Sequence, residues 1–287
     1  MTQPVRATGP IPVLGAGLIV AMLIAWAGPL GLGRLLAVPA IAALDPALIE
    51  GLFNLVVFGA LALAALGLAR WTGARFAAGI APGAGVGIGL IAGVGGVGVA
   101  LALSALAGAV QPGAGAPLRV VALAGGTLVT LFQTASEEVY FRGWLQPVLQ
   151  RGWGRWPGIA AGAAVFAAVH FASAVSNPLA LPVLLAAGLW FGILADRSAG
   201  LALPIAAHFG WNWGEALLFG ADPNPGIGSF GAIADWDLMG SPLWGGGPDG
   251  LDTSLSALFA LTALVVMSEI LPGLPARATA TPPLRPA

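Results

Sequence analysis

Two adjacent glutamates, Glu137 and Glu138, lie in the middle of a long apolar segment and are the residues of this chain best suited to chemistry. An ionised carboxylate at the centre of a bilayer costs roughly 2.5–3.5 kcal/mol, and only 8% of the residues are charged. The only two histidines, His170 and His208, also fall in apolar segments. Because a carboxylate beside an imidazole can take a proton from water, these residues together predict hydrolysis by an activated water.

Helical spacing gives these groups different neighbours. Glu138 and Arg142 are four residues apart and share a helix face, so they can form an ion pair. Glu137 is rotated by about 100° from Glu138 and stays available for catalysis. His208 and Asn212 are one turn apart, and their N–H groups could stabilise the oxyanion of a tetrahedral intermediate.

Structural interpretations of the same residues stay open. The Glu138–Arg142 pair is typical of a structural ion pair in lipid. His170, His208 and Asn212 could instead bridge helices through hydrogen bonds.

Three further residues lie near these motifs in the sequence. Phe166, four residues before His170, is expected to pack against the site. Glu215 lies seven residues beyond His208 on the same helix face and could line the cavity. Trp211 is among the tryptophans expected to anchor the chain at a membrane interface.

The chain offers little to a metal ion. It contains no cysteine and no HExxH motif, so thiolate ligands and the zincin signature are both missing. We therefore expect no cofactor, with a zinc ion held by Glu137, His170 and His208 as the alternative.

The elements that must position these side chains are membrane helices. Hydrophobic residues make up 58% of the chain and the mean hydropathy is +0.92, which predicts an all-α, polytopic membrane bundle of about eight transmembrane helices. We expect one domain over residues 1–275, with the motifs within 127–219, and a disordered cytoplasmic tail over 276–287. The eight expected spans are residues 11–32, 47–68, 83–110, 120–149, 157–174, 179–195, 201–219 and 255–271.

Arginine positions orient this bundle, because cytoplasmic segments of membrane proteins are enriched in cations. With both termini in the cytoplasm, the inside segments hold Arg6, Arg70, Arg75, Arg151, Arg155, Arg197, Arg277 and Arg285, and the outside holds only Arg34 and Arg119. The loop over 220–254 then faces outward with Asp222, Asp235, Asp237, Asp249 and Asp252. At about 1.5 Å per residue, the polar clusters lie about 16–22 Å from the cytoplasmic arginines, so they can meet in one cavity.

Glycines recur every four residues in the third span, at Gly85, Gly89 and Gly93. Such a ridge of small residues lets helix backbones pack closely in lipid. The stretch 93–98 also matches GxGxxG, but no strand precedes it, so we interpret it as a packing surface and not as a nucleotide site.

The three motifs resemble those of the CPBP family, the CAAX-protease and bacteriocin-processing intramembrane proteases, also called the Abi family. They are EExxxR at Glu137–Arg142, FxxxH at Phe166–His170 and HxxxN at His208–Asn212. The resemblance covers residues 127–219, and it implies a glutamate-dependent protease with eight spans and a cavity open to the cytoplasm.

The resemblance also implies a role for each motif residue. Glu137 and His170 would activate the water, His208 and Asn212 would bind the oxyanion, and Glu138 with Arg142 would brace the site.

The function that follows is an intramembrane endopeptidase of the bacterial plasma membrane, acting on a membrane-associated protein or peptide. It would have the lipid bilayer and that substrate as partners, and no nucleic acid. The alternative is a proton-coupled transporter or a non-enzymatic scaffold, since Glu and His sets in membranes also relay protons. Asn212 favours the protease, because an amide cannot titrate.

Overall fold

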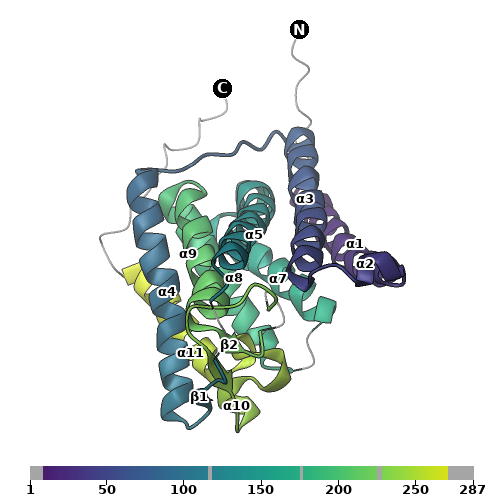
Figure 1. Cartoon of the computed structure of the whole chain (residues 1–287). Coiled ribbons are helices and arrows are strands. Elements are labelled where there is room, and N and C mark those ends of the chain that lie inside the picture. Colours follow the sequence, from purple (N-terminus) through teal and green to yellow (C-terminus); the bar gives the residue numbers. More distant parts are fainter. Residues whose placement is uncertain (1–8, 116–117, 175–176, 225–227, 271–287) are drawn as a thin grey trace, which may run out of the picture.

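The computed structural model describes residues 9–115, 118–174, 177–224 and 228–270 of the 287-residue chain (Figure 1). The expected disordered tail over 276–287 lies outside the described residues, as do Arg6, Arg277 and Arg285. The fold is helical throughout, apart from one small sheet, and it confirms the predicted class of polytopic helical membrane protein.

Two long helices at the N-terminal side present apolar faces to the surroundings. Helix α1 (Pro10–Leu36) and α3 (Pro46–Thr72) are joined by the short α2 (Pro39–Ala42). Ile19 and Trp26 of α1 are 60% and 68% exposed. Exposed apolar side chains on helices of this length are typical of contact with lipid.

Helix α4 (Pro82–Leu106) packs against α9 (Ala202–Trp213) through its glycine ridge. A Cβ atom at Gly89 would lie 2.6 Å from the Leu203 carbonyl oxygen, and one at Gly93 would collide with the backbone between Ala207 and Trp211. The backbones can approach this closely only because these positions lack side chains. The predicted packing surface is confirmed, and it holds the helix that carries His208.

One continuous helix carries the glutamate pair. It runs through α5 (Val120–Glu138), a π-helical segment η1 (Val139–Leu145) and α6 (Gln146–Trp153). The wider turn begins directly after Glu138, and π-helical turns occur frequently at functional sites. Tyr140 donates to the carbonyl of Gly17 and Trp144 to Thr72, so this helix is fastened to both α1 and α3.

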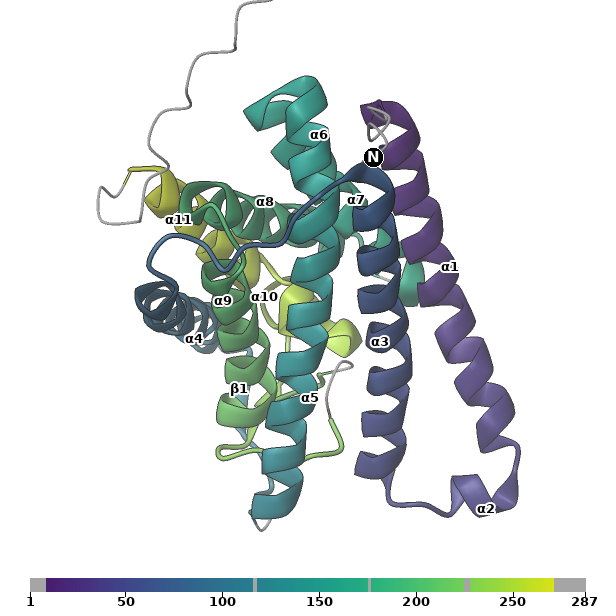
Figure 2. The ribbon, with the colours of Figure 1, turned by 90° about the horizontal axis from the view of Figure 1, so that it is seen from above.

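The remaining helices surround the cavity. They are α7 (Arg155–Ala174), α8 (Ala180–Ser198), α9 with its π-helical extension η2 (Gly214–Phe219), and α11 (Leu255–Ile270). Figure 2 shows α5 and α3 running side by side, with α9 on the other flank of α5.

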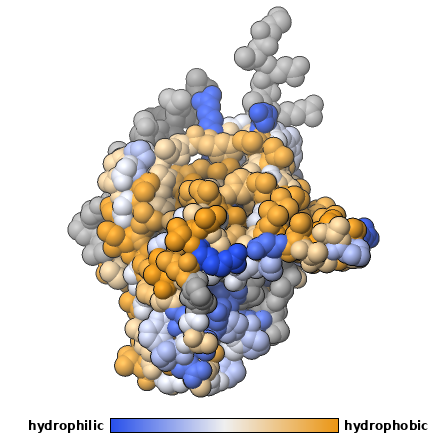
Figure 3. Space-filling model, viewed as in Figure 1, coloured by the Kyte–Doolittle hydropathy of each residue, from blue (hydrophilic) through white to orange (hydrophobic). Residues whose placement is uncertain are grey.

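The loop over 220–254 folds into a small polar cap, which the sequence did not predict in this form. Strand β1 (Val110–Pro112) pairs antiparallel with β3 (Trp236–Leu238), and β2 (Ala221–Asp222) pairs parallel with β3. The short α10 (Pro242–Gly245) follows, and two 3-10 turns, η3 (Gly247–Asp249) and η4 (Leu251–Thr253), lead into α11. Hydrophilic residues gather at this end in Figure 3, whereas hydrophobic residues cover the helices.

Contacts between helix ends gather several of the described arginines at one end of the bundle. Ile80 donates to the Ser198 carbonyl, and Arg155 pairs with Asp196 and Glu269. These contacts place the end of α3, the start of α4 and the ends of α8 and α11 at the end of the bundle opposite the cap (Figure 1).

Four helices of the described chain are long and apolar enough to cross a membrane: α1, α3, α4 and α8. The other four expected spans correspond to the α5–α6 helix, α7, α9 with η2, and α11. Of these, α11 is an apolar helix of 16 residues, and the others carry the polar residues of the motifs.

Candidate active site

Glu138, Arg142 and His208 form one buried, charge-compensated network. Arg142 Nη1 donates to Glu138 Oε1 at 2.8 Å, and both side chains are almost fully buried. His208 Nδ1 donates to the same oxygen at 2.9 Å, and Arg142 Nη2 donates to the Gly188 carbonyl of α8 at 3.1 Å. Because the paired carboxylate accepts, Nδ1 of His208 carries a proton and its Nε2 is left facing the cavity.

Glu137 points away from this network, as the rotation of about 100° predicts. Its Oε2 lies 3.7 Å from Nε2 of His170 and 3.7 Å from Nε2 of His208. The side chain is 2% exposed, and Oε2 has no hydrogen-bond partner among the described residues. These separations are too long for direct hydrogen bonds, but one water molecule can bridge all three atoms.

Aromatic rings hold both imidazoles in place. His170 Nδ1 donates to the Phe166 carbonyl at 2.8 Å, which fixes the proton on Nδ1 because a carbonyl only accepts. Phe166 packs on the His170 ring with centroids 4.2 Å apart, as expected, and the Arg142 guanidinium lies 4.6 Å from the Phe166 ring. Phe191 of α8 stacks on His208 with centroids 4.4 Å apart.

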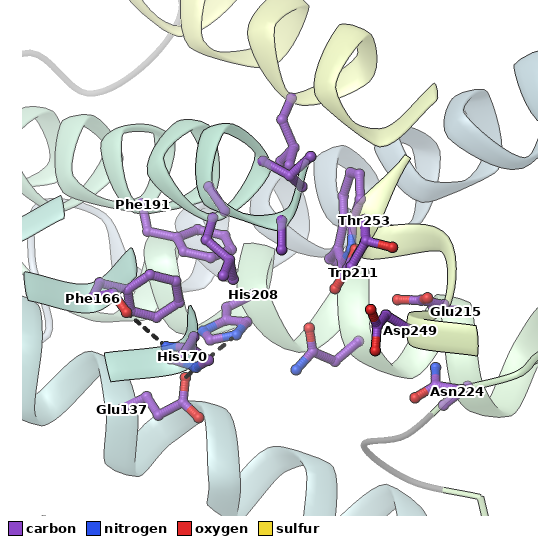
Figure 4. A pocket seen from close by; sticks show the side chains of 18 of the residues that line it. Glu137, Phe166, His170, Phe191, His208, Trp211, Glu215, Asn224, Asp249 and Thr253 are labelled. Carbon is purple, nitrogen blue, oxygen red and sulfur yellow. Dashed lines mark hydrogen bonds and ion pairs between the residues drawn. The ribbon is translucent and has the colours of Figure 1, made fainter. Parts of the chain in front are cut away.

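A cavity of about 300 Å³ brings the three motifs together (Figure 4). Glu137, His170, His208 and Asn212 all line it, so the predicted catalytic residues share one space. Its polar and aromatic lining residues are Gln133, Glu137, Phe166, His170, Phe191, His208, Trp211, Asn212, Glu215, Asn224, Asp249, Asp252 and Thr253.

Acidic residues line the other end of this cavity. We call this the loop end, formed by Glu215, Asp249 and Asp252, and we call the region of Glu137, His170 and His208 the motif end. Trp211 Nε1 donates to Asp252 at 2.9 Å. Trp211 is only 3% exposed, so its expected role as an interfacial anchor is wrong.

The electrostatics of the loop end are unfavourable as they stand. Glu215 is 5% exposed and accepts no hydrogen bond within the described chain. Asp252 lies close enough for the two charges to repel, and burial raises the pKa of Asp252 above its ordinary value.

The cavity reaches the polar cap, because Asn224, Asp249, Asp252 and Thr253 belong to the loop over 220–254. The arginines gather at the opposite end. The arginine-based orientation and the cytoplasmic opening implied by the family resemblance therefore point to different compartments.

The zinc ion considered as the alternative cofactor would need Glu137, His170 and His208 as its ligands. Within the described residues, no group of three or more His, Asp or Glu side chains is arranged to hold a metal ion.

Several lining and supporting residues were missed by sequence reasoning. Phe191 and Gly188 lie in α8, which carries no motif. Gln133 lies one turn before Glu137, and its buried Oε1 has no hydrogen-bond partner in the described part of the chain. For Asp249 and Asp252, the acidic bias of the loop was the available signal, but it did not place them in the cavity.

Comparison with known proteins agrees with the motifs. Residues 119–214 match the family model described as Rce1-like, type II CAAX prenyl endopeptidase. This segment contains Glu137, His170, His208 and Asn212, and the match confirms the predicted resemblance to the CPBP proteases. No curated protein and no solved structure gave a significant match.

Proposed function

Taking the Rce1-like segment over residues 119–214 as the premise, we propose that this multi-pass membrane protein is an endopeptidase that hydrolyses a peptide bond with a water activated by Glu137 and His170. One observation carries the proposal: a buried carboxylate oxygen of Glu137, without a hydrogen-bond partner among the described residues, lies 3.7 Å from Nε2 of two histidines and faces a cavity.

The water is activated at the point where these three atoms converge. Glu137 takes a proton from the water molecule while the oxygen of that water attacks the carbonyl carbon of the substrate. His170, with its Nδ1 proton held by Phe166, presents the Nε2 lone pair toward the same point and can share the proton. No covalent enzyme intermediate is needed.

The oxyanion forms on the other side of the attacked carbon. Asn212 supplies amide N–H donors, and His208 supplies an Nε2–H donor in its doubly protonated form. The Nδ1 of His208 bonds Glu138, and its Nε2 lies near Glu137 and faces the cavity. Glu138 and Arg142 hold the ring in this orientation and do not touch the substrate.

Collapse of the intermediate completes the reaction. The proton taken by Glu137 passes to the nitrogen of the leaving amine as the C–N bond breaks, which yields a carboxylic acid and an amine. One water is consumed, and the glutamate returns to its ionised state.

The family match implies a protein or peptide substrate in or at the bilayer. We propose the bacterial plasma membrane as its location, with both termini in the cytoplasm. In that orientation substrates reach the cavity from the outer side, where the polar cap lies.

The orientation can be tested cleanly because the chain has no cysteine. A cysteine placed at Asp237 in the cap should react with a membrane-impermeant maleimide added to intact cells. A cysteine placed at Arg75 should react only after the membrane is opened. The reverse pattern would place the cap in the cytoplasm and overturn this orientation without affecting the proposed chemistry.

Terminal proteomics of membranes tests the activity. Cells that express the wild-type chain should show new protein termini that are missing with Glu137→Gln, and the loss in rate should be about 10²–10⁴-fold. Glu269→Gln is the matched control, because Glu269 pairs with Arg155 outside the cavity and its loss should leave the termini unchanged.

Two further arms separate the alternatives. A metal chelator should leave the cleavage unaffected. Identical termini from wild type and Glu137→Gln, with both chains folded, would reject the protease and favour the proton-relay or scaffold interpretation.

A further inference from the structure

The geometry points to a subsite for a cationic side chain of the substrate at the loop end of the cavity, formed by Glu215, Asp249 and Asp252. This inference rests on the proposed endopeptidase function and deepens it by naming the class of substrate.

Glu215 is a buried carboxyl group that lacks a donor among the described residues. Glu215 is only 5% exposed, lines the cavity, and accepts no hydrogen bond within the described chain. Burying a carboxylate without a partner is costly, and such groups in native proteins are paired or wait for a ligand. Asp252 increases the cost, because its charge repels that of Glu215.

The described lining of the cavity offers these carboxyl groups no arginine or lysine. None of the described residues that line the cavity is an arginine, and the chain contains no lysine. Two of the neighbouring donors are neutral groups: Trp211 bonds Asp252, and the Asn177 backbone N–H bonds Asp249. An ammonium or guanidinium group would supply the donors and the charge that the site lacks.

The loop end lies a few peptide residues away from the reacting groups. Glu215 lies seven residues beyond His208, which is about 10 Å along the helix. An extended peptide advances about 3.3 Å per residue. The subsite would therefore hold a side chain about three residues from the scissile bond, within one continuous cavity (Figure 4).

The same charges act against one kind of substrate. A free carboxylate at a peptide C-terminus would be repelled by Glu215 and Asp252, so a substrate that places its C-terminus there is disfavoured. The subsite thus selects an internal or N-terminal segment that contains Lys or Arg.

A pair of matched peptides tests the subsite. Short Ala/Leu peptides with one Lys, or with norleucine at the same position, would be moved stepwise along the sequence. Binding to the full-length Glu137→Gln protein in detergent would be measured by fluorescence polarisation, and cleavage by the wild-type protein by mass spectrometry. We expect a preference for Lys over norleucine of about tenfold to a hundredfold at one position.

Variants connect this preference with the named residues. Glu215→Gln and Asp252→Asn should each remove most of the preference while norleucine peptides still bind. Asp237→Asn removes one acid of the same loop that does not line the cavity, and it should leave the preference intact. Glu215→Arg should reverse the preference toward a peptide with Glu in place of Lys.

The outcomes distinguish the subsite from the proposed activity. Cleavage without any preference for Lys, or an equal loss with Asp237→Asn, overturns the subsite and leaves the protease standing. Preferential binding of Lys peptides without cleavage by the wild type supports the subsite and argues against the protease. Absence of both effects overturns both.

Discussion

At the motif end of the cavity, Glu138 meets the guanidinium of Arg142 and the imidazole of His208, whereas at the loop end Glu215 forms no ion pair and accepts no hydrogen bond among the described residues. Glu138 and Glu215 are both buried, so solvation does not explain the difference between these two carboxyl groups. The compensated end fixes the orientation of a ring that must act in the same geometry each time. The carboxyl groups of the loop end remain available to bind a cationic side chain of a substrate.

The largest effect is expected when the cation of the motif end, Arg142, is removed. Arg142→Met leaves Glu138 buried without its ion pair and should destabilise the fold by about 3–5 kcal/mol. Thermal unfolding in detergent would measure the loss. The double variant Glu138→Gln/Arg142→Met should recover a large part of it, because no buried charge is then left unpaired. A single variant as stable as wild type would mean that the pair does not support the fold.

A second variant acts on both ends together through the helix that carries them. Gly93→Ala places a Cβ against the backbone of α9 and should cost about 1–3 kcal/mol in stability. Cleavage and the preference for Lys should fall together, because His208 and Glu215 move with α9 and its extension. Gly95→Ala is the matched control, since its Cβ would meet nothing within 4 Å. Equal melting temperatures for the two variants would contradict the close contact of α4 with α9.

The compensated end could be predicted from sequence because its partners lie at helical spacing. Glu138 and Arg142 are one turn apart, as are His208 and Asn212, and apolar segments of spanning length locate the helices that carry them. Counting residues from the arginines then brings the three motifs to compatible depths, and the structure places them in one cavity. Here local periodicity carries nearly all of the information.

The loop end could not be predicted in this way. Asp252 is held by Trp211 across 41 residues, and Asp249 by Asn177 across 72. The small sheet that shapes the cap joins strands from two distant segments, 110–112 and 236–238. In loops, the spacing of residues in the sequence does not determine the direction of their side chains. The acidic bias of the loop was therefore visible in the sequence, whereas the position of its aspartates in the cavity was not.

A milder test concerns the stability cost of the uncompensated end. Glu215→Gln replaces a buried carboxyl group that accepts no hydrogen bond among the described residues, and it should raise the stability of the substrate-free protein by up to about 1 kcal/mol. Asp237→Asn in the exposed cap should change it by much less. Destabilisation by Glu215→Gln would reveal that Glu215 has a structural partner, and it would weaken the contrast between the two ends.

The smallest effect expected is a pH dependence of the preference for Lys peptides and of folding stability that comes from Asp252 at the loop end. Burial raises the pKa of Asp252, so its carboxyl takes up a proton at a higher pH than an exposed aspartate does. As the pH falls through this raised pKa, the negative charge is lost and the preference for Lys peptides should weaken. Folding stability should move in the opposite direction, because a raised pKa in the folded state means that protonation favours the fold.

Matched titrations isolate this contribution of Asp252. The difference between wild type and Asp252→Asn, followed by peptide binding to the Glu137→Gln background and by thermal unfolding, should show the two opposite trends. The difference between wild type and Asp237→Asn should show neither. If binding of Lys peptides instead weakened as the pH rose through this range, the charge of Asp252 would not be what attracts the cation. The two ends of the cavity would then differ in packing and not in charge.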